Sequence, residues 1–162
     1  MTTLKKIHNP FVHQKGSDYN CFGCSPGNHM GLKLEFFADN DHVVAYWCPN
    51  RGFEGYTNVV HGGIQATLLD EIASWYIYAM LDTVGVTRKL DVSYHKPFYV
   101  STGKARIEAS LIQQTKSIAL IKAKIVNANG VICSSARVEY YLFPPEIARV
   151  KYNYPGIEAF YE

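Results

Sequence analysis

The stretch that decides the fold is NVVHGGIQATLLDEIASWYIYAM, residues 58–80. From Gly63 to Leu81 it contains no proline, and apolar residues occupy nearly every face of a helix with about 3.6 residues per turn. A helix that is apolar all round is a buried helix, so this one is predicted to lie in the core. It would be about 28 Å long at a rise of about 1.5 Å per residue. Asp70 and Glu71 interrupt the apolar run, and a buried carboxylate without a partner is costly.

The segments around the helix alternate apolar and polar residues, as β-strands do. Two of them precede the helix, at 31–39 and 42–49, and an Asp-Asn-Asp turn joins them into a predicted hairpin. Four more strands are expected after the helix, at 87–98, 103–115, 117–130 and 131–143. This order predicts an α+β fold in which one long central helix is wrapped by a curved antiparallel sheet of about six strands.

The predicted domain therefore spans residues 31–143. Residues 1–30 are expected to form an irregular N-terminal segment, because they are rich in glycine, proline, asparagine and serine. Pro144 and Pro145 end the last strand, and the C-terminal tail at 144–162 is interpreted as a short helix or an aromatic arm.

Composition restricts the classes of function. The chain has 162 residues, of which 48% are hydrophobic and 19% charged, and its net charge is +2. These values are typical of one globular domain and give no basis for nucleic-acid binding. The best candidate for a membrane span is broken by Asp70 and Glu71, and the N-terminus lacks the apolar core of a signal peptide. We therefore expect a cytoplasmic protein without membrane association, with reduced cysteines and no cofactor.

Three features of the sequence point to one family. The first is HGGIQATLLD (61–70), in which His-Gly-Gly opens the helix and an acid follows nine residues after the histidine. The second is the lead-in CFGCSPGNHMGLKLEF (21–36), and the third is Thr87 at the start of the next strand. Together with the strand order, they resemble the PaaI-like hotdog-fold acyl-CoA thioesterases, over residues 20–143. One branch of that family has a similar lead-in, and related enzymes often have Ser or Thr at the position of Thr87.

The resemblance implies hydrolysis of acyl-CoA thioesters, with acyl-CoA as the substrate. This chemistry needs a stabilised oxyanion and either a nucleophile or a base-activated water. The helix N-terminus at Gly62 and Gly63 offers unpaired N–H groups at the positive end of the helix dipole, and glycine lets a carbonyl approach closely. The alternative is that His-Gly-Gly only makes a tight turn into the helix.

Asp70 is the carboxylate that the resemblance assigns as base or nucleophile. The alternative from the residues alone is a structural hydrogen bond between Asp70 and a nearby threonine or tyrosine. Glu71 points about 100° away around the helix and is either a second active-site group or the partner of an arginine. The resemblance further implies that Thr87 positions the attacking water or Asp70.

His61 is interpreted as an orienting or turn-stabilising residue rather than a general base, because its neighbours are backbone amides. The chain departs from the family pattern upstream of this histidine. Many relatives have an asparagine six residues before it, where this chain has Gly55, and Asn58 is the candidate substitute.

The separation of Gly62 and Asp70 along the helix predicts a dimer. Gly62 and Asp70 are eight residues apart on one helix, which separates them by about 12 Å, so one carbonyl cannot contact both. If both act on one thioester, they come from different subunits across a two-fold axis. The family resemblance implies the same arrangement, a homodimer with antiparallel helices and two sites, or a dimer of such dimers.

Cys21-x-x-Cys24 is interpreted as part of a packed loop that covers the pocket. A structural zinc site would require a second pair of ligands, and His29 and Cys48 do not supply one at the usual spacing. A redox motif would be expected to start a helix, whereas Ser-Pro-Gly follows Cys24. No metal site is therefore predicted.

Two other functions are compatible with the same fold. One is a dehydratase acting on a hydroxyacyl thioester, although its histidine would more typically lie in a proline-rich loop. The other is a non-catalytic protein that binds acyl-CoA or another small ligand. Five basic residues are candidates for contacts with the phosphates of coenzyme A: Arg88, Lys89, Lys96, Lys104 and Arg137.

Overall fold

The structure, a computed structural model, describes residues 3–162. Its strands are β1 (Lys5–Ile7), β2 (Phe36–Asp39), β3 (His42–Trp47), β4 (Gly85–Tyr94), β5 (Ala105–Gln114), β6 (Ile118–Val126) and β7 (Ile132–Leu142). Its α-helices are α1 (Phe11–Lys15), α2 (Gly62–Met80) and α3 (Pro145–Tyr152). Four short 3-10 helices are η1 (Gly16–Asp18), η2 (Arg51–Phe53), η3 (Val100–Thr102) and η4 (Ile157–Phe160).

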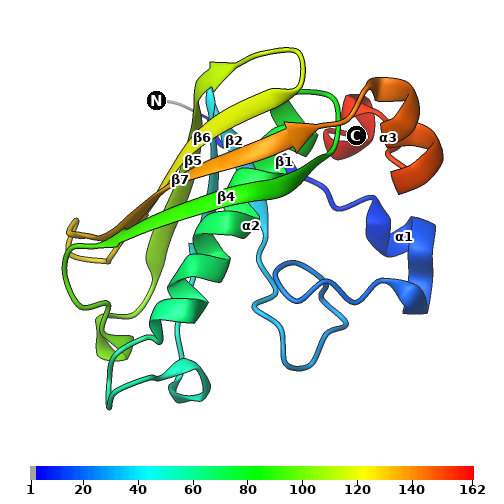
Figure 1. Cartoon of the computed structure of the whole chain (residues 1–162). Coiled ribbons are helices and arrows are strands. Elements are labelled where there is room, and N and C mark those ends of the chain that lie inside the picture. Colours follow the sequence, from blue (N-terminus) through cyan, green and yellow to red (C-terminus); the bar gives the residue numbers. More distant parts are fainter. Residues whose placement is uncertain (1–2) are drawn as a thin grey trace.

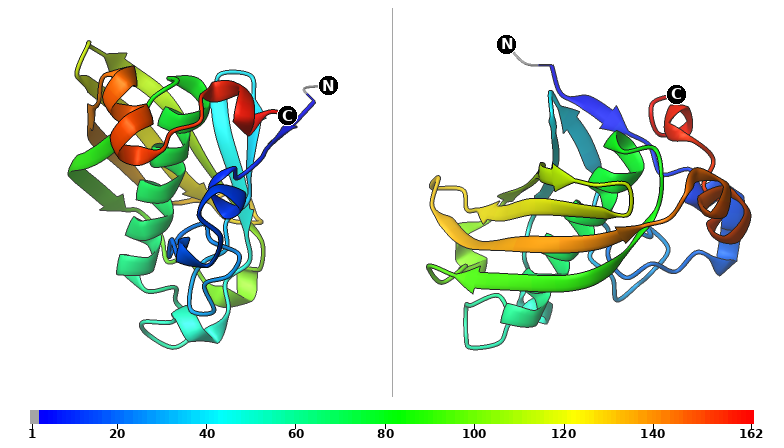
Figure 2. Two further views of the ribbon diagram at one scale, coloured as in Figure 1. Left: turned by 90° about the vertical axis from the view of Figure 1, so that its right-hand side faces the viewer. Right: turned by 45° about the horizontal axis from the view of Figure 1, so that its top comes forward.

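The strands form one antiparallel sheet in the order β1-β2-β3-β5-β6-β7-β4. The sheet curves around α2, which lies along its concave side (Figures 1 and 2). A connection that contains η2 joins the β2–β3 hairpin to α2. After the helix, β4 lies at the opposite edge of the sheet, beside β7. The prediction of a long helix wrapped by a curved antiparallel sheet is confirmed.

The core lies between α2 and the concave face of the sheet. Buried residues recur on α2 at Leu68, Leu69 and Ile72 and continue to Trp75, whose ring stacks on Phe36 at 4.3 Å between ring centroids. The opposite side of α2 is only partly covered. It carries small and polar residues at helical spacing: Gly63, Ala66, Thr67, Asp70 and Ser74.

The structure differs from the sequence-based expectation at the N-terminal end of the sheet. Strand β2 begins at Phe36 rather than at residue 31, because Leu32 and Leu34 pair with the lead-in instead of with another strand. Their N–H groups donate to the carbonyls of Phe22 and Gly23 at 2.8 and 2.9 Å. The seventh strand, β1, comes from the segment that was expected to be irregular, and it pairs with β2.

The C-terminal tail covers the end of α2. Phe160 in η4 is buried against Trp75, and the hydroxyl of Tyr161 donates to the carbonyl of Ala79 at 2.9 Å. The tail is thus a short helix followed by an aromatic segment. In residues 3–162, no helix is long and apolar enough to cross a membrane.

The packing of α2 makes a prediction about stability. Leu68 is fully buried, so Leu68→Ala should lower the free energy of unfolding by about 2–5 kcal/mol through lost burial and the cavity left behind. Urea unfolding followed by circular dichroism measures this. Met30→Ala is the matched control, because Met30 is 80% exposed and its truncation should change little. An equal effect of both variants would contradict the placement of α2.

Candidate active site

Asp70 is held in one orientation by two hydroxyl groups. Thr87 at the start of β4 donates a hydrogen bond from Oγ1 to Asp70 Oδ1 at 2.9 Å. The hydroxyl of Tyr140 on β7 lies 2.6 Å from the same Oδ1 and 2.7 Å from the Asp70 carbonyl oxygen, so its proton is shared between them. The other carboxylate oxygen, Oδ2, accepts no hydrogen bond from residues 3–162. The sequence-predicted contact between Thr87 and Asp70 is thus present, and Oδ2 is left free to act on a ligand.

The sequence reasoning missed Tyr140. It is buried, and its burial together with the negative charge of Asp70 raises its pKa well above the usual range. Tyr140 therefore stays protonated and serves as a donor to Asp70. A signal was available, because Tyr140 occupies an inward position of the alternating strand β7, and a buried tyrosine hydroxyl needs a partner.

His61 caps the N-terminus of α2. Its Nδ1 accepts a hydrogen bond from the N–H of Gly63 at 2.9 Å, so this nitrogen carries no proton and the ring acts as a structural acceptor. The N–H of Gly63 is therefore occupied, which differs from the expectation that both glycine N–H groups are free. The N–H of Gly62 donates to no group in the described part of the chain, and the Gly62 carbonyl accepts from the Tyr94 hydroxyl at 2.6 Å.

A surface hollow of about 460 Å³ adjoins this helix end. Its walls come from the loop before α2 and include Tyr56, Val59 and Gly62. A ligand in this hollow would meet the free N–H of Gly62 and the positive end of the 19-residue helix dipole. These are the features of a helix end that suits a group with negative charge on oxygen.

Asn58 holds the loop before α2 in place. Its backbone is in the left-handed region, with φ of 65°, and its side chain exchanges two hydrogen bonds of 2.9 Å with Ser101 in η3. Its N–H donates to Glu54. Asn58 thus anchors the loop before α2 to η3, and the structure does not bring it to the Asp70 cluster.

Glu71 faces away from Asp70, into the protein. Its Oε1 accepts hydrogen bonds from Trp75 Nε1 at 3.1 Å and from Cys21 Sγ at 3.4 Å, and in the described residues no arginine forms an ion pair with it. Burial raises the pKa of Glu71 above its usual range. The two neighbouring carboxylates therefore occupy different environments, one with an open oxygen and one enclosed.

The candidate basic residues come from several elements. Arg88 pairs with Glu139 at 3.4 Å, and the ammonium of Lys104 lies over the ring of Tyr46. Arg137 lines a separate hollow on the exposed face of the sheet with Lys122. Lys89 and Arg88 lie close to Arg137, because Lys89 is the register partner of Glu139, which contacts Arg88, and Arg137 is two residues before Glu139 on β7.

Comparisons with known proteins agree with this architecture. Residues 57–134 match the family model of the thioesterase superfamily. An uncharacterized protein of Schizosaccharomyces pombe is 38% identical over 55 residues, which are 33% of this chain and 31% of that protein. The match thus spans about a third of this curated relative.

Solved structures show the same fold. The PaaI protein of E. coli, from its phenylacetic acid degradation operon, is 16% identical with a TM-score of 0.63, over 70% of this chain and 81% of that chain. A hypothetical thioesterase of Streptococcus pneumoniae, solved with coenzyme A, is 23% identical with a TM-score of 0.61, over 68% and 85% of the two chains. The chain therefore has the hotdog fold, and its predicted resemblance to the PaaI-like thioesterase superfamily is confirmed.

The link between Tyr140 and Asp70 can be tested by stability. Tyr140→Phe keeps the buried ring and removes one hydrogen bond to a charged group, so it should lower the free energy of unfolding by about 1.5–3 kcal/mol. Tyr141→Phe, at a partly exposed neighbouring position with no hydrogen bond from its hydroxyl within residues 3–162, is the control. Denaturant titration of the two variants measures the difference, and equal stability would show that the Tyr140 bond contributes nothing.

Proposed function

We propose that the protein hydrolyses acyl-CoA thioesters. The observation that carries the proposal is a carboxylate fixed through Oδ1 by Thr87 and Tyr140, with Oδ2 free, on the same helix as an unpaired N–H at Gly62. A base or nucleophile and an oxyanion donor are the two groups that thioester hydrolysis requires. The confirmed resemblance to the thioesterase superfamily supports this chemistry over others that use the fold.

In the proposed reaction, the thioester carbonyl oxygen accepts a hydrogen bond from the N–H of Gly62. Asp70 then attacks the carbonyl carbon or removes a proton from the water that attacks it. If Asp70 acts as the base, the water oxygen forms the new C–O bond, the C–S bond breaks, and the leaving thiolate takes up the proton held by Asp70. If Asp70 attacks, the C–S bond breaks as an acyl-aspartate anhydride forms. Water then hydrolyses this anhydride, which releases the carboxylic acid, restores Asp70 and supplies the proton that the thiolate takes up. The coenzyme A bound to the Streptococcus pneumoniae relative supports a coenzyme A ester as the substrate class.

The two groups are assigned to different protomers of a dimer. Eight residues of helix separate Gly62 from Asp70 by about 12 Å, which is too far for one carbonyl. Two antiparallel copies of α2 that cross at a two-fold axis near Ala66 would bring each Asp70 to the Gly62 of its partner. The small residues on the partly covered side of α2 permit such a close approach.

The edge of the sheet supports the same assembly. Strand β4 pairs only with β7, which leaves its other edge without a partner in residues 3–162. Its two ends reach both halves of the site, because Thr87 contacts Asp70 and Tyr94 contacts Gly62. Val86 and Tyr94 are 42% and 54% exposed on this strand. An open edge beside an open helix face is the surface that a second copy of the chain would cover.

The first test concerns the carboxylate. Asp70→Asn keeps an acceptor for Thr87 and Tyr140 but removes the negative charge, so thiol release from a panel of acyl-CoA substrates should fall about 10²–10⁴-fold. The released thiol is measured with a chromogenic disulfide, and sedimentation confirms that the dimer is intact. An unchanged rate on a good substrate would refute the assignment of Asp70. Binding of acyl-CoA without thiol release by the wild type would favour the non-catalytic alternative.

The second test asks whether the site is shared between protomers. Gly62→Pro removes the N–H at the first helical position, where proline is tolerated, and the backbone angles of His61 (φ −54°, ψ 135°) suit a residue before proline. Activity should fall about 10²–10³-fold. Gly62→Ala is the matched control, because it keeps the N–H and its Cβ would contact the Tyr94 ring at an ordinary 3.4 Å.

Co-expression of the two inactive chains under different tags then gives a heterodimer that carries Asp70→Asn in one protomer and Gly62→Pro in the other. If each site combines Asp70 of one protomer with Gly62 of its partner, one site is intact and about half of the wild-type activity returns. If each site lies within one chain, the heterodimer stays inactive. A purely monomeric wild-type protein would also contradict the shared site.

A further inference from the structure

The lead-in loop places two thiols against a partly buried carboxylate. Cys21 Sγ and Cys24 Sγ are 2.9 Å apart, and Cys21 Sγ is 3.4 Å from Glu71 Oε1. One donor atom from each of the three residues lies within 4.8 Å of the other two. The cysteines come from the loop before β2 and the carboxylate from α2, so chain segments about 50 residues apart in sequence meet at this point.

The cluster is a chain of polar groups that ends on negative charge. Asn9 donates to the hydroxyl of Tyr19 at 3.1 Å, which leaves the Tyr19 proton for Cys24 Sγ at 2.9 Å. Cys24 in turn donates to Cys21. In the described residues no cation forms an ion pair with Glu71, and the ammonium of Lys15 lies over aromatic rings instead.

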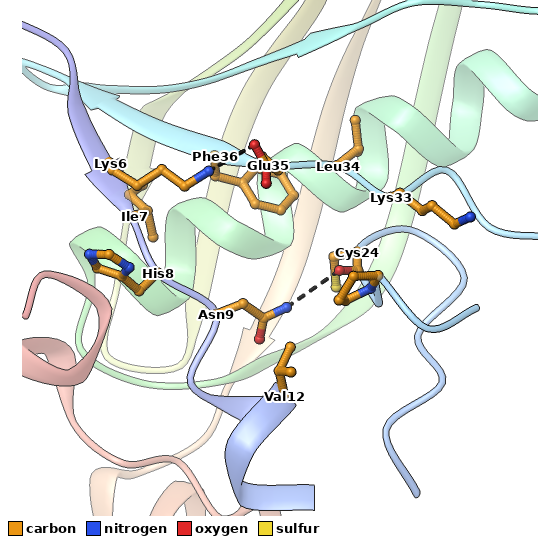
Figure 3. Close-up of a pocket in the computed structure, with 11 residues that line it drawn as sticks. Lys6, Ile7, His8, Asn9, Val12, Cys24, Lys33, Leu34, Glu35 and Phe36 are labelled. Atoms are coloured by element: carbon orange, nitrogen blue, oxygen red, sulfur yellow. Dashed lines mark hydrogen bonds and ion pairs between the residues drawn. The ribbon is translucent and has the colours of Figure 1, made fainter. Parts of the chain in front are cut away.

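The loop is shaped to hold this arrangement. A Cβ added at Gly23 would overlap with the side chain of Glu71, so a larger residue between the cysteines would have to displace the carboxylate. The Gly23 carbonyl accepts from the N–H of Leu34, and the amide of Asn9 donates to the Cys24 carbonyl at 3.4 Å (Figure 3). Trp75 fixes Glu71 through Oε1, which leaves Oε2 facing the loop.

We propose that Cys21, Cys24 and Glu71 bind a zinc ion. Two thiolates and a carboxylate are ligands that zinc accepts, whereas calcium and magnesium prefer oxygen atoms only. A dication would neutralise the charge of a partly buried carboxylate that forms no ion pair within residues 3–162. The tryptophan bond to Glu71 and the tyrosine bond to Cys24 are the kind of supporting contacts that orient metal ligands. This site is independent of the proposed hydrolysis.

Zinc would need a fourth ligand and a small movement of the sulfurs. A cavity of about 290 Å³ adjoins all three donors and also has Tyr19 and Ser74 in its wall, so a water can complete the tetrahedron. Two thiolates on tetrahedral zinc lie about 3.8 Å apart, so the sulfurs would separate by roughly 0.9 Å from their present 2.9 Å. Rotation of the half-buried Cys21 side chain toward the cavity provides this room.

The ion would tie the lead-in loop to α2 at the residue next to Asp70. Glu71 would be fixed from the loop side by zinc and from the helix side by Trp75. The segment of α2 that carries both carboxylates would then be stabilised by metal binding, because a ligand that binds only the folded state raises the midpoint of thermal unfolding.

The experiment uses the full chain, stripped with a chelator and reduced with a phosphine. Titration with Zn²⁺, and separately with Co²⁺, should give one metal per chain by elemental mass spectrometry after desalting, with a thiolate-to-cobalt charge-transfer band. Cys21→Ser and Cys24→Ser should lose the band, and Glu71→Gln should weaken binding at least tenfold. Cys48→Ser and Cys133→Ser are matched controls that should bind like the wild type.

A second measurement needs no variant. Zinc should protect Cys21 and Cys24 from alkylation by a maleimide, while the exposed Cys48 still reacts, as peptide mass spectrometry reports. The proposal is overturned if the reduced wild type takes up no metal, or if Glu71→Gln binds as tightly as the wild type. A Cys21–Cys24 disulfide that reforms in air, with no metal uptake after reduction, would identify a redox pair instead and also overturn it.

Discussion

The structure depends on one constraint: a single curved sheet covers only one side of helix α2. The covered side is apolar and contributes Leu68, Leu69 and Ile72 to the core. The remaining side cannot be buried within the chain, and it carries glycine, alanine, threonine and aspartate instead of large apolar residues. The candidate catalytic carboxylate lies on this side because a charged group is tolerated there. The uncovered side is also where a second protomer would be needed.

Much of the fold could be predicted because its patterns are local. The apolar run and His-Gly-Gly predicted a helix that begins within one residue of α2, and strict alternation predicted the four strands after it. Strand β1 could not be predicted, since three residues are too few to show a period. Leu32 and Leu34 alternate like strand residues, yet their N–H groups pair with the lead-in loop. The sequence pattern is the same whether such residues pair with a loop or with a strand.

The site was predicted where the family resemblance assigned its residues and missed where it rests on other distant contacts. The bond between Thr87 and Asp70 was expected, whereas Tyr140 lies 70 residues further along the chain and was identified only in the structure. The cysteines illustrate the same limit. A zinc site was set aside because no second cysteine pair was present, but the third candidate ligand, Glu71, is on α2 and is brought to the loop only by folding.

Asp70 and Glu71 are adjacent on α2, yet their carboxylates lie in different environments. Adjacent residues point about 100° apart, so one carboxylate reaches the uncovered side and the other enters the interior under the lead-in loop. Asp70 therefore cannot reach the lead-in loop and Glu71 cannot reach the uncovered side, although the two residues share a backbone segment. Any ligand that orders Glu71 also restrains the helix turn that carries Asp70, because the two residues are adjacent and the buried Trp75 anchors Glu71 to the core. A metal on the inner side would thus act on Asp70 only through the helix that the two residues share.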